Sequence, residues 1–180
     1  MTGRLYALID RKRRDCGLTP ADIPVEPMEL AAREGKALVI QRRPFSRRGL
    51  GGALFKGEVS LITLNDRRGP EEMRFSLAHE LIHYWFDDGT AAPAFSEWRA
   101  NEGAAELLVP RAVFVPLAAG QALDAHRGSL RDLERDAPWL TGAAALFGVT
   151  GPVIRYRLRS LRGETQFSIG SVQTGPDVVK

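Results

Sequence analysis

Residues 74–86 are RFSLAHELIHYWF, a segment with two histidines four residues apart and a glutamate directly after the first. On a helix, positions four apart project from one face, so the imidazoles of His79 and His83 can converge on one metal ion. Glu80 is rotated about 100° from His79, which sets its carboxylate beside that ion, where it can take a proton from bound water. The segment therefore predicts a helix that carries a zinc site and a catalytic base.

Most of the other side chains in this segment are apolar, which predicts burial on most sides of the helix. Pro70, followed by Glu71 and Glu72, suits the first turn of a helix. Two histidines and a glutamate are costly to bury unless a partner uses them. We therefore prefer a metal site to a structural helix whose core histidines are satisfied by other groups.

A catalytic zinc needs a third protein ligand and an open position for water. The extended pattern with glycine at 86 and histidine at 89 is excluded, because the chain has Phe86 and Gly89 there. The remaining histidine, His126, has no supporting pattern around it. Asp87 and Asp88 lie at the end of the same helix and are awkwardly placed to fold back onto the metal.

The next predicted helix is capped by Ser96 and runs to about residue 109, before a proline. Glu97 and Asn101 share one stripe on it, and the apolar end of that stripe can pack against the first helix. Glu102 is at the wrong angle to reach the metal, and Glu106 lies about two turns further along. Spacing therefore favours Glu97 as the third ligand.

Short aliphatic segments at 36–43, 51–57 and 58–66 predict three strands joined by short turns, and hence a small, mostly antiparallel sheet. The last of these strands is expected at an edge beside the active-site helix, where a substrate peptide can add to it. Helical patterns also occupy residues 4–16, 27–34, 111–118, 129–136, 139–147 and 151–161. The tail from 163 is irregular, with a strand pattern at 165–172.

The length of 180 residues and a hydrophobic content of 44% suit a single domain. We expect one α+β unit over 1–180, with a catalytic core at about 36–118, accessory helices at about 119–162 and the irregular tail at 163–180. The single cysteine, Cys16, excludes an intramolecular disulfide and a cysteine-rich zinc ribbon. No segment approaches the roughly 18 apolar residues of a membrane span, so a cytoplasmic protein without a signal peptide is expected.

The three main motifs resemble the ImmA/IrrE metallo-endopeptidases. The pattern of that family is a strand ending in asparagine, then RFxLAHELxH, then ExxANxFAAELLMP. The present chain has LITLN at 61–65, RFSLAHELIH at 74–83 and EWRANEGAAELLVP at 97–110, in the same order. A weaker likeness continues through residues 140–161.

The resemblance implies a minimal zincin-like fold in which a small sheet packs on two active-site helices, with further C-terminal helices. It also implies Zn²⁺ as the cofactor and a helix-turn-helix transcriptional repressor as the substrate, cleaved in mobile-element induction or a stress response. By this resemblance, the metal ligands are His79, His83 and Glu97. Glu80 is implied to be the general base, and Asn101 to form a hydrogen bond to a metal ligand. Two departures are visible: Gly103 replaces a bulky apolar residue after the variable position 102, and Ile82 replaces a frequent glycine.

Other functions stay open. Net charge is only +3, but arginine-rich segments occur at 11–14, 42–48 and 155–162, which suits nucleic acid or acidic partners. Residues 144–162 have the pattern of a helix, a turn and an arginine-bearing helix that can enter a DNA groove. We prefer the interpretation that their apolar residues pack on the core and their arginines are solvated. A zinc protein that sequesters its partner without cutting it is a third interpretation. Tyr84 is assigned to the core in preference to a role at the oxyanion.

Overall fold

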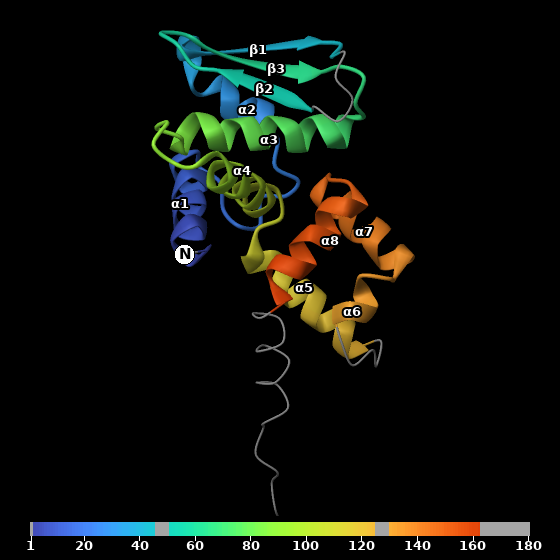
Figure 1. The fold of residues 1–180 in the computed structure, drawn as a ribbon. Coiled ribbons are helices and arrows are strands. Elements are labelled where there is room, and N and C mark those ends of the chain that lie inside the picture. The colour runs from blue at the N-terminus through green and yellow to red at the C-terminus, as the bar shows by residue number, and fades with distance from the viewer. Residues whose placement is uncertain (1, 46–50, 125–129, 163–180) are drawn as a thin grey trace, which may run out of the picture.

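The computed structural model describes residues 2–45, 51–124 and 130–162. Over these residues the chain forms helices and a three-stranded sheet, which confirms the α+β class (Figure 1). His126 and the tail with its strand pattern at 165–172 lie outside the described residues. The elements are α1 (Thr2–Asp15), α2 (Pro27–Ala32), a short 3₁₀ turn (Gly35–Ala37), β1 (Leu38–Arg43), β2 (Gly52–Phe55), β3 (Ser60–Asn65), α3 (Pro70–Phe86), α4 (Pro93–Leu108), α5 (Arg111–Asp124), α6 (Leu130–Leu133), α7 (Ala137–Phe147) and α8 (Gly151–Ser160).

The sheet is mixed, with the strand order β1-β3-β2. β2 pairs with β3 antiparallel through a short turn, whereas β1 pairs with β3 parallel. The prediction of a mostly antiparallel sheet is wrong for the β1 pair, because the chain crosses from one edge of the sheet to the other between β1 and β2. The strand after residue 58 is consequently the central one, and the expectation that it forms an edge is also wrong. The edge beside α3 belongs to β2.

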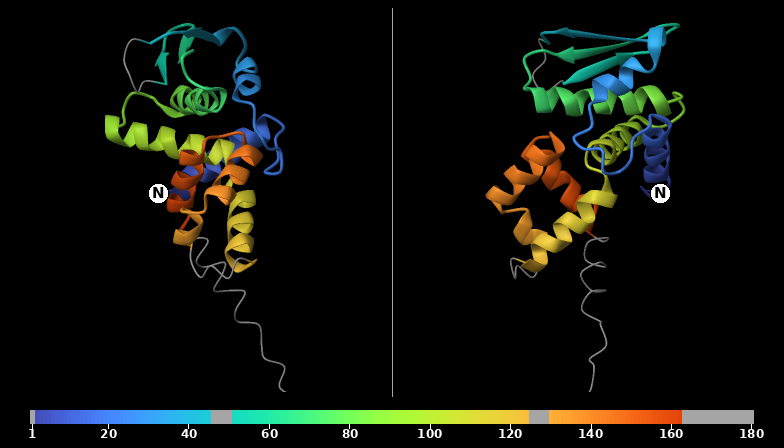
Figure 2. Two further views of the ribbon diagram at one scale, coloured as in Figure 1. Left: turned by 90° about the vertical axis from the view of Figure 1, so that its right-hand side faces the viewer. Right: turned by 180° about the vertical axis from the view of Figure 1, so that it is seen from behind.

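Helix α3 lies between the sheet and helix α4, and α1 packs beside α4 (Figures 1 and 2). Its Ala78 and Leu81 have no exposed surface, and Ile62 of the sheet is equally buried. Such complete burial removes most freedom of rotation and translation from the helix, since the core is packed at crystal-like density. Side chains of α3 that do reach a cleft are therefore held in fixed directions.

The two departures from the family pattern meet at the contact between α3 and α4. A Cβ atom added at Gly103 of α4 would lie 3.0 Å from Cγ2 of Ile82 on α3. The family pattern has a large apolar side chain on α4 and a glycine on α3. In this chain the large side chain is Ile82 on α3, and Gly103 on α4 provides the space for it. The helices stay close because the exchange conserves volume approximately.

Helices α5 to α8 form the other end of the molecule (Figure 2). Phe147, Val153, Ile154 and Leu158 are buried in the common core, as the packing interpretation of this segment expects, while Leu146 is 45% exposed. Helix α5 runs to residue 124, beyond its predicted end, and continues through an internal proline.

A buried polar cluster attaches α8 to α4 and α1. Arg157 of α8 has no exposed surface and forms ion pairs with Glu102 and Glu106 of α4. The hydroxyl of Tyr6 donates to Glu102 Oε1 at 2.6 Å, and that of Tyr156 donates to Oε2 at 2.7 Å. The guanidinium also donates through Nε to the carbonyl of residue 109 at 2.9 Å. Every charge in the cluster therefore has a hydrogen-bonded partner, as buried charges require.

No single helix among the described residues has both the length and the apolar character to cross a membrane. Two bent helix pairs, Pro93–Leu108 with Arg111–Ala122 and Ala137–Phe147 with Gly151–Ser160, meet the criteria of length and composition only when each pair is taken together.

Candidate metal centre

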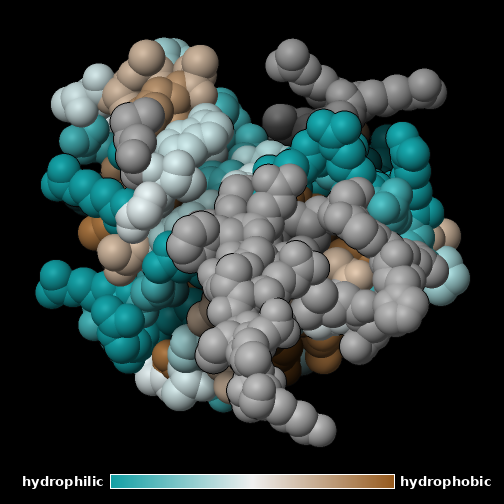
Figure 3. Space-filling model, turned by 90° about the horizontal axis from the view of Figure 1, so that it is seen from below, coloured by the Kyte–Doolittle hydropathy of each residue, from teal (hydrophilic) through white to brown (hydrophobic). Residues whose placement is uncertain are grey.

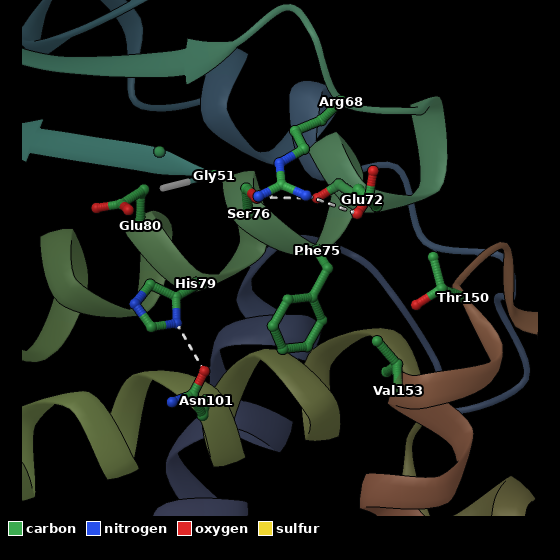
Figure 4. Close-up of a pocket in the computed structure, with 11 residues that line it drawn as sticks. Gly51, Arg68, Glu72, Phe75, Ser76, His79, Glu80, Asn101, Thr150 and Val153 are labelled. Carbon is green, nitrogen blue, oxygen red and sulfur yellow. Dashed lines mark hydrogen bonds and ion pairs between the residues drawn. The ribbon is translucent and has the colours of Figure 1, made fainter. Parts of the chain in front are cut away.

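The two histidines of α3 turn their Nε2 atoms toward each other. His79 Nδ1 lies 3.1 Å from Asn101 Oδ1, and His83 Nδ1 lies 2.5 Å from Asp87 Oδ2, while the two Nε2 atoms are 3.0 Å apart (Figure 4 for His79 and Asn101). Because both Nδ1 atoms face oxygen acceptors, they are the protonated nitrogens, and the Nε2 lone pairs face each other. Two lone pairs at this distance repel unless a cation lies between them.

Glu97 of α4 completes the group. Its Oε2 lies 3.5 Å from Nε2 of His79, and its Oε1 lies 3.5 Å from Nε2 of His83. One ligand atom from each of the three residues lies within 4.8 Å of the others. Two ligands of a tetrahedral zinc, each at about 2.0–2.1 Å, are about 3.3 Å apart. The donor set and its spacing therefore fit zinc, and the role of these residues as ligands stays a prediction.

The electrostatic environment of His79, His83 and Glu97 also favours the binding of a cation. Burial, followed by repulsion from His83, lowers the pKa of His79, so its imidazole is neutral near neutral pH. A neutral imidazole is the form that binds metals. The side chain of Glu97 is 62% exposed, so its oxygens reach the site from the open side.

Asp87 has a role that the sequence did not predict. Its carboxylate accepts hydrogen bonds from Nδ1 of His83, from the hydroxyl of Ser96 and from the guanidinium of Arg99. Burial would raise the pKa of Asp87, but these hydrogen bonds outweigh it and hold the pKa at about 2. Asp87 thus lies on the Nδ1 side of the imidazole, away from the metal position, and orients His83 as Asn101 orients His79. The signal in the sequence was its position four residues after a candidate ligand.

Ser96 does not cap α4, which corrects the sequence prediction. The helix begins four residues earlier than a cap at Ser96 would give, at Pro93, with Ala92 at the N-cap. A proline at the first helical position is favourable because its missing N–H has no partner there in any helix. Ser96 instead lies within the helix, and its hydroxyl bonds to Asp87.

Glu80 points into a cleft beside the histidines. Only 7% of the residue is exposed, and burial raises the pKa of its carboxyl to about 7. A Cβ atom added at Gly52 of β2 would lie 3.0 Å from Glu80 Oε1. The glycine therefore lets the edge strand approach the carboxylate closely.

The cleft has two lobes that meet at Gly52, His79 and Glu80. The lobe in Figure 4 has a volume of about 380 Å³ and continues to Phe75 of α3 and Val153 of α8. The opposite lobe, of about 700 Å³, runs along β2 and past Asp87, and its lining residues are Gly52, Ala53, Leu54, Lys56, His79, Glu80, His83, Asp87, Asp88, Gly89, Pro93, Ser96 and Glu97. An extended chain can thus pass across the metal position from one lobe to the other.

The remaining candidates lie elsewhere. Glu102 and Glu106 are the buried partners of Arg157, and Asp88 binds the backbone and hydroxyl of Thr90. Tyr84 is partly buried against the apolar core and is absent from the residues that line the two lobes, which favours its assignment to the core.

A comparison of the chain with models of protein families gives a match. The model of the Peptidase_M78 family, described as the IrrE N-terminal-like domain, matches residues 33–159. That range covers the sheet, both helices of the metal centre and most of α8. A search of curated proteins finds no match.

Proposed function

This chain belongs to the Peptidase_M78 family of ImmA/IrrE metallopeptidases, and from this we propose that it is a zinc-dependent endopeptidase. His79, His83 and Glu97 hold the metal in this proposal, and Glu80 is the catalytic base. The observation that carries it is the convergence of two imidazole Nε2 atoms and a carboxylate at one end of a cleft that also contains a buried glutamate.

Bound zinc supplies Lewis acidity, which acidifies water and polarises a carbonyl group. Glu80 takes a proton from the attacking water and delivers it to the amine that leaves. Without a metal, burial raises the pKa of Glu80 to about 7. A bound cation beside the carboxyl would lower this pKa and so favour the ionised form, which is the form that acts as a base. Asn101 and Asp87 keep the imidazoles in the Nδ1–H form, so that the Nε2 lone pairs stay available.

The free edge of β2 positions the substrate in this proposal. Gly52, Ala53 and Leu54 of this strand line the lobe that contains the candidate ligands. An extended peptide can add to such an edge through main-chain hydrogen bonds, which hold the scissile bond in place with little dependence on side chains. The close approach of β2 to Glu80 at Gly52 brings that peptide within reach of the base.

For the substrate we propose a helix-turn-helix transcriptional repressor, cleaved to relieve repression in mobile-element induction or a stress response. The support for this part is the resemblance to the ImmA/IrrE family over residues 61–110.

The test uses the zinc-loaded protein and the repressor encoded beside it. We expect defined fragments from the wild type and a rate about 10² to 10⁴-fold lower for Glu80→Gln. Glu71→Gln is the matched control, because it changes an exposed carboxylate on the same helix. Equal rates for Glu80→Gln and the wild type would remove the assignment of the base. If the repressor stayed intact in a stable complex with the protein, the function would be sequestration of the repressor and not its cleavage.

A further inference from the structure

A pocket lined mainly by arginines lies between α6 and α8. These two helices belong to the end of the molecule away from the sheet (Figure 1). The pocket has a volume of about 660 Å³. Hydrophilic side chains also project from the margins of the molecule when it is viewed from this end (Figure 3). The lining residues, called the arginine pocket below, are Arg131, Glu134, Arg135, Arg155, Arg159 and Arg162.

The arginine pocket has a large excess of positive charge. Five guanidinium groups and one carboxylate line it, so positive charge predominates among these lining residues. Glu134 Oε2 accepts a hydrogen bond from Nε of Arg159 at 3.0 Å, and Oε1 accepts one from Arg162. Its backbone carbonyl accepts from Nε of Arg155 at 3.2 Å. Glu134 therefore fixes three arginines in place without neutralising the pocket.

The geometry of α8 matches a phosphate chain. Arg155, Arg159 and Arg162 are four and three residues apart, so they lie along one side of the helix and its last turn. Their span is about 10 Å, since the rise is about 1.5 Å per residue. Three successive steps of one strand in duplex DNA, which join four phosphates, rise by about the same length, at 3.4 Å each, so the three arginines extend over a stretch of about four phosphates. Planar guanidinium forks also match phosphate oxygens better than ammonium groups do.

The connection between α7 and α8 is a second sign of a nucleic-acid site. The two helices are bent by 97°. Gly148 between them adopts a φ of 62°, which ends α7 in the left-handed region. Helix pairs that bind DNA have an angle of this size and a short turn that often contains glycine.

The arginine pocket opens away from the proteolytic cleft. Thr150 and Val153 line the cleft, whereas Arg155 is rotated by about 200° from Val153 on the same helix. Arg157, which is fully buried against α4, contributes nothing to the pocket. A peptide in the cleft therefore does not cover the side of α8 that lines the arginine pocket.

We propose that the arginine pocket binds the phosphate backbone of duplex DNA, in addition to and independently of the proposed peptidase activity. The apolar side of α8 packs on the core, and only its arginine side contacts the phosphates. Binding of this kind is electrostatic and holds the protein on DNA with little dependence on base sequence.

The experiment measures binding of the full-length, zinc-loaded protein to a labelled random-sequence duplex by fluorescence anisotropy. Between about 50 and 200 mM salt, a plot of log K against log salt has a negative slope, with an expected magnitude of about 0.9 for each phosphate that the arginines neutralise. Replacing Arg135 and Arg155 together by alanine lowers the magnitude of that slope by about 2. Both residues are exposed, and an unchanged zinc content and melting temperature verify the fold.

Arg4→Ala with Arg14→Ala is the matched control, because both are exposed arginines on α1 and the change in net charge is the same. This control keeps the wild-type slope, and Arg135→Lys with Arg155→Lys retains most of it. The proposal is overturned by an absence of binding at low salt, or by an equal loss in the α1 variant. Equally tight binding of polyglutamate at the same concentration of charges would assign the pocket to acidic proteins instead.

Discussion

The two ends of α4 use the same residue type in opposite ways. Glu97, in the second turn, is 62% exposed and directs its oxygens at two imidazoles. Glu102 and Glu106, further along the helix, are 2% and 0% exposed, and their oxygens bind Arg157 and tyrosine hydroxyls. A glutamate can serve a metal only where the protein leaves its oxygens without other donors. The end of α4 that carries Glu97, called the open end below, thus leaves carboxylate oxygens available to a metal. The end that carries Glu102 and Glu106, called the closed end, binds Arg157 and stabilises the fold.

The closed end is stabilised as a unit. Burial, followed by the hydrogen bond to Glu102, raises the pKa of Tyr6 to about 12, so its hydroxyl remains a donor at any ordinary pH. Burial and the same carboxylate also raise the pKa of Tyr156. Arg157 lies between the two glutamates, so loss of its guanidinium leaves two buried carboxylates without their ion pairs.

Substitution of Arg157, at the closed end of α4, has the largest predicted effect on the stability of the protein. Arg157→Met leaves Glu102 and Glu106 buried without their cation, so the free energy of unfolding falls by about 3–5 kcal/mol. Urea denaturation of the zinc-free protein measures this loss. Arg155→Met, two residues away and exposed, changes stability by less than about 0.5 kcal/mol. A loss in Arg157→Met as small as that in Arg155→Met would mean that the cluster contributes little to the fold.

Glu80, at the open end, is a buried carboxylate that interacts electrostatically with His83 and Glu97. Its effect on stability is therefore expected to depend on pH. Its pKa is about 7 in the folded protein against 4.5 for the ordinary group, because burial disfavours the charge. Below pH 4.5 both states are protonated and Glu80 has no effect on stability. Above pH 7 both states are ionised, and the folded state carries a cost of about 3 kcal/mol.

Glu80→Gln is therefore expected to stabilise the zinc-free protein by about 3 kcal/mol at pH 8 and to leave it unchanged at pH 4. Urea denaturation at the two pH values measures this difference. Glu97→Gln is the control, since that side chain is mostly exposed and has little charge burial to relieve. A Glu80→Gln variant that is no more stable than the wild type at pH 8 would show that the charge is solvated or paired in the folded state.

The convergence of His79, His83 and Glu97 at the open end was predictable from the sequence. The hydrogen bonds of Asp87 at that end and the cluster at the closed end were not. The spacing of His79 and His83 predicted a common face, and the position of Glu97 at the start of the next helix predicted its approach to them. Such inferences succeed because they depend on helical periodicity, which is local. The partners of Arg157 come from helices far apart in the chain, so periodicity carried no information about them.

The errors in the fold prediction have a similar cause. Consecutive strands were assumed to be neighbours, but β1 reaches β3 only because the chain crosses the sheet between β1 and β2. Gly103 and Ile82 looked like two separate departures from the family pattern, and only the packing of α3 on α4 shows that one compensates the other. The strand order and the compensation between Gly103 and Ile82 thus depend on contacts between distant parts of the chain, which local sequence patterns do not predict.

The smallest predicted effect concerns the residues that orient the ligands at the open end. Asp87→Ala removes the nearer acceptor of His83 Nδ1, leaving Ser96 Oγ at 3.3 Å and all three candidate ligands in place. We expect zinc affinity to fall by about 10 to 100-fold, which is the usual cost of losing such a partner. Competition with a chromophoric chelator measures it, and Asn101→Ala is expected to give a similar loss through His79.

Asp88→Ala is the matched control, because its exposed carboxylate bonds to Thr90 and lies next in the chain. It is expected to keep the wild-type affinity. Glu97→Ala, in contrast, removes a ligand and weakens binding by more than the loss of an orienting residue does. If Asp87→Ala lost zinc while Glu97→Ala retained it, the metal would be held by Asp87. The exposed glutamate of α4 would then have no more chemical role than its buried neighbours.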